Sequence, residues 1–196
     1  MILSKNDLRF YIEEDKKACL KYGSGKSIIE KIYYFMFPTD NIMAFRYLRS
    51  LRNLEYATNC LKSNGVVGKI RYLYYKARNR HYGVKYGIFI APNTVGYGFY
   101  IPHVVGGGII LNSRSIGNYC SANAGVVVGV NHTQDSKPII GNNVAMNIGC
   151  KIVGKITIGD NVTIGPNTVI YKDVPSDCVV LGVPAQVIRR KDSRKV

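Results

Sequence analysis

The chain has 196 residues, enough for one sizeable domain or for a small helical piece joined to a second unit. Its net charge of +15 favours polyanionic partners, which include nucleic acid, an anionic membrane surface and a phosphorylated cofactor. Zinc-ligand spacing, aromatic RNA-binding strands and a recognition helix are all missing from the sequence, so nucleic acid is discounted as a partner.

The sequence contains neither a recognisable secretory signal nor a stretch that is long and apolar enough to span a membrane. Residues 1–10 carry Lys5 and Asp7 and lack an apolar core, so no secretory signal is expected. No apolar stretch approaches the length of a membrane span. The five cysteines are scattered, without a CxxC pair, as is typical of a reducing compartment. A cytoplasmic location is therefore predicted.

The N-terminal part predicts helices. A first helix is expected from residue 7 to about 22, where two glycines follow. A second begins at Ser27, with Glu30 as its capping-box partner, and ends before Pro38. A third and longest helix starts after residue 40 and is closed by an Asn-Gly pair.

A fourth, basic segment follows at residues 69–80, where apolar side chains alternate with Lys and Arg. Between Tyr56 and Gln134 the chain has no Asp or Glu, against eight Lys or Arg. The basic, tyrosine-rich part of this segment, residues 71–76, fits peripheral association with an anionic membrane, at its inner face, although packing against the first coil explains the same residues at least as well. The helical period ends near residues 81–86, so residues 1–85 are assigned to a helical N-terminal region.

From Ile110 to Pro175 an apolar residue returns every six positions, a period that neither a helix nor a strand produces. A unit this short cannot bury a core alone, so copies must stack as a three-sided solenoid. The sequence therefore predicts a mainly β fold, a left-handed parallel β-helix over residues 86–190, with a basic tail at 191–196. The leading inward column holds Ile110, Ile116, Ala122, Val128, Ile140, Met146, Ile152, Ile158, Ile164 and Ile170. A second column holds Cys120, Val126, Val144, Cys150, Ile156, Val162, Thr168 and Val174.

Glycine or asparagine often follows the leading residue, as at Gly117 and Gly141, and a positive φ is expected there. Two interruptions break the period. Three consecutive glycines, residues 106–108, are inserted before Ile110, and the polar segment 130–138 reads as a loop leaving the coil. Protruding loops on a rigid prism are where a binding site is shaped.

The order of four motifs resembles the serine acetyltransferase branch of the hexapeptide-repeat acyltransferases, and in particular its cell-surface polysaccharide acetyltransferases. The motifs are Ile101-Pro102-His103 before the glycines, then residues 139–144, 172–175 and 182–185. The resemblance covers about residues 86–190. It implies a homotrimer that binds acetyl-CoA, the acyl donor, in the groove between neighbouring prisms.

The same resemblance makes His103 the catalytic base, because an acceptor hydroxyl must lose its proton as it attacks the thioester and neutral imidazole can take it. A zinc hydratase of the same fold would need three histidines on adjacent coils. Only His103 and His132 fall in the solenoid, so no metal is expected.

For the cofactor, the family pattern carries over onto Gly149, Cys150, Thr168, Lys172 and Arg189. The small residues would let the pantetheine arm lie against the coil. Lys172 and Arg189 would face the phosphates as charge-assisted partners, with a plain basic surface as the alternative for both.

The departures from the family concern the acceptor. Residues 86–100, which should supply an acid to orient the histidine, contain none, and Lys137 stands where the family has a second histidine. His132 is a candidate substitute for that histidine, and a solvated loop residue is the alternative. The expected function is therefore O-acetylation of a sugar hydroxyl in cell-surface polysaccharide biosynthesis. Serine O-acetylation in cysteine biosynthesis and a non-catalytic β-helix scaffold are the alternatives.

Overall fold

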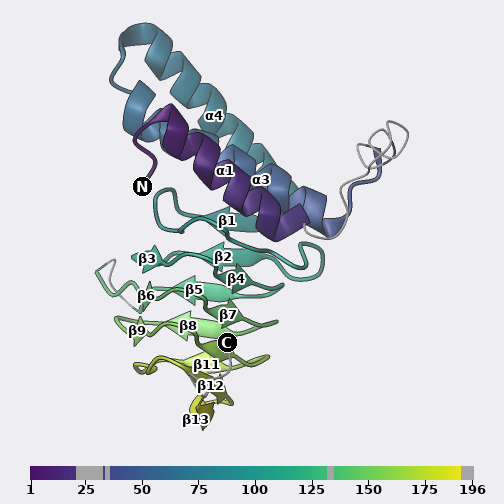
Figure 1. Cartoon of the computed structure of the whole chain (residues 1–196), viewed down its shortest axis with the longest axis vertical. Coiled ribbons are helices and arrows are strands. Elements are labelled where there is room, and N and C mark those ends of the chain that lie inside the picture. The colour runs from purple at the N-terminus through teal and green to yellow at the C-terminus, as the bar shows by residue number, and fades with distance from the viewer. Residues whose placement is uncertain (21–32, 34–35, 132–134, 191–196) are drawn as a thin grey trace.

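The computed structural model describes residues 1–20, 33, 36–131 and 135–190. Helices lie across one end of a tall stack of short strands, and the chain descends the stack from there (Figure 1). Most of the second predicted helix, residues 27–37, falls outside the described residues. None of the described helices is both long and apolar enough to cross a membrane.

Three helices form what we call the helical layer: α1 (Lys5–Leu20), α3 (Asp40–Tyr56) and α4 (Gly65–Tyr86), with a π-helical turn, η1 (Ala57–Leu61), after α3. Helix α3 is central, because it packs against both α1 and α4. Helix α4 is longer than the predicted basic segment at both ends. It stops at Gly87, whose φ of 68° is left-handed, as is common just beyond a helix C-terminus.

Below this layer the chain forms a three-sided prism of parallel strands, which confirms the predicted fold class. The first sheet has the order β1-β2-β5-β8-β11, the second β13-β12-β10-β7-β4 and the third β3-β6-β9. The last strand, β13, is antiparallel to β12 and closes the stack. The strands are β1 (Ile88–Ile90), β2 (Ile109–Leu111), β3 (Ser115–Ile116), β4 (Ser121–Ala122), β5 (Val127–Gly129), β6 (Ile139–Ile140), β7 (Ala145–Met146), β8 (Lys151–Val153), β9 (Thr157–Ile158), β10 (Thr163–Ile164), β11 (Val169–Ile170), β12 (Cys178–Leu181) and β13 (Gln186–Arg190).

Both predicted inward columns are buried, with one exception. Ile110 was expected inside and is 47% exposed, while Ile109 and Leu111 point into the core. The reason is a shift of register: Leu111 pairs with Val128, and it lies five positions, instead of six, before Ile116, the next residue of the leading column. Because side chains alternate along a strand, a shift of one residue turns each of them to the opposite face.

The prediction of positive φ at Gly117 and Gly141 is wrong. Left-handed backbone occurs two residues later, at Tyr119 and Asn143. Gly117 serves close stacking between coils, because a Cβ there would lie 2.6 Å from the carbonyl oxygen of Gly141. Neighbouring coils approach so closely at this corner that a side chain there would clash with the next coil, which explains the glycines.

A buried arginine joins the helical layer to the prism. Arg52 on α3 donates from Nε to Asp15 of α1 at 2.8 Å and from Nη1 to Glu55 at 3.0 Å. It also donates to the carbonyl oxygens of Val95, at 2.9 Å, and Gly96, at 2.6 Å, in the first coil. Burial opposes its charge, but Asp15 and Glu55 raise the pKa of Arg52 above its ordinary value. The cluster holds α1, α3 and the first coil together.

Candidate active site

His103 lies at the edge of the prism between the second and first sheets, on the segment that runs from the buried Ile101 to β2. Its side chain is 60% exposed. Nδ1 is 3.3 Å from Oδ2 of Asp40, the first residue of α3. A carboxylate only accepts hydrogen bonds, so this contact assigns the ring proton to Nδ1 and leaves the lone pair of Nε2 free to take a proton.

Sequence reasoning missed Asp40. The acid was sought on the coil before the histidine, whereas the structure supplies it from the helical layer, 63 positions away. An acid in the first turn of a helix is ordinary, because it suits the helix dipole. The sequence therefore carries no signal that distinguishes Asp40 from a simple helix-terminal residue.

The same edge carries a column of glycines. Gly87, Gly108, Gly125 and Gly149 all have positive φ, between 64° and 73°, and stack coil upon coil. A Cβ on Gly125 would lie 3.3 Å from the Cα of Gly149. These four positions therefore present only backbone on the edge that carries His103.

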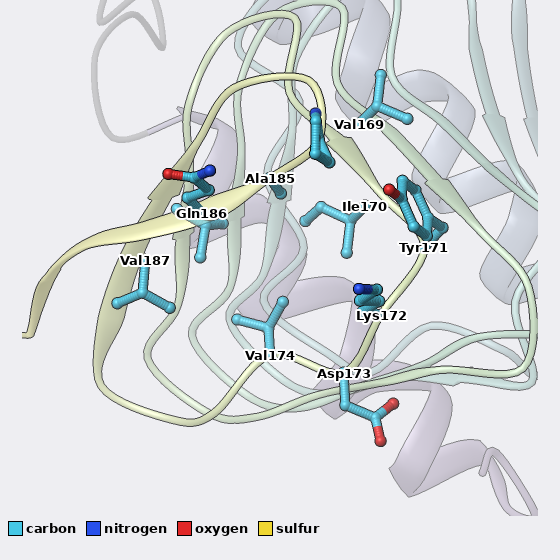
Figure 2. A pocket seen from close by; sticks show the side chains of 11 residues that line it. Val169, Ile170, Tyr171, Lys172, Asp173, Val174, Ala185, Gln186 and Val187 are labelled. Atoms are coloured by element: carbon cyan, nitrogen blue, oxygen red, sulfur yellow. The ribbon is translucent and has the colours of Figure 1, made fainter.

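Lys172 lines a pocket of about 230 Å³ at the far end of the prism, beneath the last coil (Figure 2). Tyr171 lies beside it, with the lysine ammonium 5.9 Å from the ring centre. Val174 and Ala185 supply apolar wall. Arg189, the other predicted phosphate partner, is exposed on β13, two residues beyond the last lining residue, Val187.

Cys150 and Thr168 lie inside the prism, and both are fully buried. Burial raises the pKa of the Cys150 thiol to about 12. The Oγ1 atom of Thr168 has no hydrogen-bond partner within the described part of the chain. Any contact of these two residues with a cofactor therefore rests on their backbone atoms.

Lys137 is half-buried and precedes β6, at the edge between the first and third sheets. His103 occupies the opposite edge of the first sheet, so one chain does not bring the two together. His132 lies outside the described residues. Across residues 1–20, 33, 36–131 and 135–190, no three His, Cys, Asp or Glu side chains are grouped as metal ligands.

Known proteins match this chain in sequence. Residues 137–172 match the family described as bacterial transferase hexapeptide (six repeats). A serine acetyltransferase of Synechococcus elongatus is 41% identical over 112 residues, which are 55% of this chain and 45% of the relative. One from Buchnera aphidicola is 27% identical over 205 residues, covering 98% of this chain and 66% of the relative. The chain spans less than two thirds of the length of these curated relatives.

Solved structures share the fold. One described as a serine acetyltransferase in complex with CoA has a TM-score of 0.68 at 22% identity and covers 94% of this chain and 71% of its own. The Neisseria gonorrhoeae serine acetyltransferase in complex with serine has a TM-score of 0.64 at 23% identity, and the match covers 93% of this chain and 70% of that structure.

The prediction of a sugar acceptor in polysaccharide biosynthesis is wrong, because the relatives are named serine acetyltransferases. The argument against serine rested on a missing acid in residues 86–100. Oδ2 of Asp40 lies within hydrogen-bonding distance of the His103 ring, so the missing coil acid no longer argues against serine. In its repeat over residues 137–172 and in its left-handed β-helix, the chain is similar to the hexapeptide-repeat acyltransferases.

Proposed function

We propose that this chain transfers an acetyl group from acetyl-CoA to the hydroxyl group of L-serine. The names of its relatives support the reaction, and the 3.3 Å contact between Asp40 and His103 carries the assignment of the base. Nε2 of His103 removes the hydroxyl proton as the serine oxygen attacks the thioester carbonyl. The tetrahedral intermediate then expels the coenzyme A thiolate, which takes the proton back from the imidazolium.

The proposed cofactor path runs along the stack of coils. β1 and β11 are the first and fifth strands of one sheet, so Lys172, just after β11, lies about 19 Å down the axis from the first coil at ~4.8 Å per strand. Acetyl-CoA supplies the acyl group when bound. Lys172 and the glycine column lie on opposite edges of the first sheet, so Lys172 of one subunit would hold a phosphate while the glycine column of the neighbouring subunit, which includes Gly149, would accept the pantetheine arm.

We propose a homotrimer as the functional assembly. His103 occupies one edge of the first sheet, whereas Lys137 and Lys172 follow strands at its opposite edge. A heterologous contact that repeats around a threefold axis joins two different edges of neighbouring subunits. Such a contact would bring the His103 edge of one prism to the Lys137 and Lys172 edge of the next, which completes the site between subunits.

Cytoplasmic location and peripheral contact with the inner face of a membrane also belong to this proposal. The support for membrane contact is the outward face of α4, where exposed apolar residues lie among basic ones.

The deciding experiment follows loss of the thioester absorbance of acetyl-CoA, with and without L-serine. This readout avoids a thiol reagent, which would also label the protein's own free cysteines. Wild type should consume acetyl-CoA only with serine, and His103→Ala should lower kcat by about 10² to 10⁴. Lys155→Ala, an exposed control, should leave turnover unchanged.

Two results would contradict the proposal. If His103→Ala keeps full turnover, His103 is not the base. If wild type gives no serine-dependent turnover, serine is not the acceptor, and a calorimetric titration in which coenzyme A also fails to bind would favour the scaffold alternative.

A further inference from the structure

Helix α4 turns an apolar stripe away from the rest of the protein. The stripe residues follow one another at spacings of four, three, four and seven, which return them to one side of a helix. Ile70 is 61% exposed and Leu73 is 59% exposed, so neither packs against the first coil. The opposite side of α4, with Tyr72, Tyr75 and Tyr86, faces the protein instead. We name Val66, Ile70, Leu73, Ala77 and Val84 the outer stripe.

Basic residues border the outer stripe on both sides. One border holds Lys69, Lys76 and Arg80, and the other holds Arg71, Arg78 and Lys85; all six are exposed. The sequence has no Asp or Glu from residue 57 to residue 134, so no acid on α4 neutralises them. An exposed apolar stripe between two rows of cations is the pattern of a helix that lies in a membrane interface.

We propose that the outer stripe docks α4 flat on an anionic lipid surface. The apolar side chains would enter the boundary between headgroups and acyl chains, and the bordering Lys and Arg would meet lipid phosphates. The outer stripe runs from Val66 to Val84, so it offers a contact about 27 Å long at about 1.5 Å per residue. In Figure 1 the N-terminal part of α4 lies on the side of the helical layer that is far from the prism, whereas its C-terminal end contacts β1, so a flat surface can reach the outer side of the helix.

A second copy of the chain is a poorer occupant of this face. Pairing two outer stripes would bring the two sets of six cations together with no acid between them, and like charges across an interface oppose association. An anionic surface instead complements every one of these charges. This inference does not depend on the acyl-transfer reaction.

The test is cosedimentation of the full chain, without acetyl-CoA or serine, with vesicles of phosphatidylcholine alone or mixed with phosphatidylglycerol. Wild type should bind the anionic vesicles, with affinity that falls as salt is raised, and the neutral vesicles far more weakly. Ile70→Ser/Leu73→Ser and Lys69→Gln/Arg71→Gln should each weaken binding by about ten-fold or more.

Matched controls carry the same changes elsewhere. Val183→Ser/Ile188→Ser removes exposed apolar residues at the other end of the molecule, and Lys5→Gln/Arg9→Gln removes exposed cations from α1. Both should bind like wild type. Circular dichroism checks the fold of each variant. If the Ile70→Ser/Leu73→Ser variant does not fold, the binding of the charge variant and the lipid dependence of wild-type binding still test the inference.

Three outcomes would overturn the inference. Wild type could bind neutral and anionic vesicles equally, or the controls could lose as much binding as the α4 variants. In the third outcome, the stripe variant would bind vesicles like wild type but form a smaller oligomer by sedimentation velocity. That result would assign the outer stripe to contact with a second copy of the chain.

Discussion

Asp40 and His103 lie 63 positions apart, yet Oδ2 of Asp40 is 3.3 Å from Nδ1 of His103. The contact joins the start of α3 to the edge of the first coil, so the helical layer contributes directly to the candidate site. It also explains how a prism without an acid in residues 86–100 can hold an imidazole in one tautomer. The helical layer is therefore part of the chemistry that we propose, in addition to covering the end of the stack.

Asp40→Asn should lower kcat about ten-fold to a hundred-fold while coenzyme A affinity stays the same, because the asparagine amide can also donate to Nδ1 and select the unproductive tautomer. Asp40→Glu should recover part of the activity. Steady-state kinetics and calorimetry measure the two effects, with Glu13→Gln, a change to an exposed acid on α1, as control. Equal losses of kcat and coenzyme A affinity would indicate a structural role for Asp40.

Gly117→Ala should destabilise the fold by about 1–3 kcal/mol, the usual cost of overpacking. The new Cβ would lie 2.6 Å from the carbonyl oxygen of Gly141, and backbone in a neighbouring coil cannot move aside cheaply. Gly129→Ala is the matched control, because its Cβ would meet no atom within 4 Å. Urea unfolding measures both, and equal stability of the two variants would refute the stacking argument.

Arg52→Ala should lower the free energy of unfolding by about 3–5 kcal/mol, because it leaves the carboxylates of Asp15 and Glu55 buried without their cation. Lys16→Ala breaks an exposed ion pair with Glu13 and should change the unfolding midpoint little. Thermal unfolding compares them. A small loss for Arg52→Ala would mean that water replaces the guanidinium.

Lys172→Ala should weaken coenzyme A binding about five-fold, the effect of one exposed ion pair with a phosphate. Lys155→Ala lowers the net charge equally without touching the pocket, so it separates a specific contact from the general basic field. Calorimetric titration measures both affinities. Equal weakening by the two changes would remove Lys172 from the proposed site.

Thiol labelling at pH 8 should modify Cys60 and spare the buried cysteines until the chain unfolds. Burial raises the pKa of Cys19 and Cys150 to about 12 and that of Cys120 to about 11, so these thiols stay protonated. Mass spectrometry after alkylation identifies the labelled positions. Rapid labelling of Cys150 in the folded protein would contradict its place in the core.

The same pKa shifts predict that the stability of the fold decreases at alkaline pH. The folded-state pKa values lie above the ordinary thiol value of 9.0, so the folded chain binds more protons at alkaline pH. Stability from these thiols is complete below about pH 9 and is lost as the pH rises toward about 12. Urea midpoints across this range should fall.

The sequence alone determined the prism, because a six-residue period is a local property: each coil repeats the same two inward positions and needs only its neighbours to bury them. The sequence also indicated His103, beside the glycine insertion, as the candidate catalytic base. Only the tertiary structure decided what surrounds that histidine, since Asp40 arrives from a helix and no spacing encodes the approach. The period wrongly predicted Ile110 as inward, and it did not say which way Ile70 points. Period and composition show which residues are apolar, whereas their burial depends on which surface the folded chain places against them.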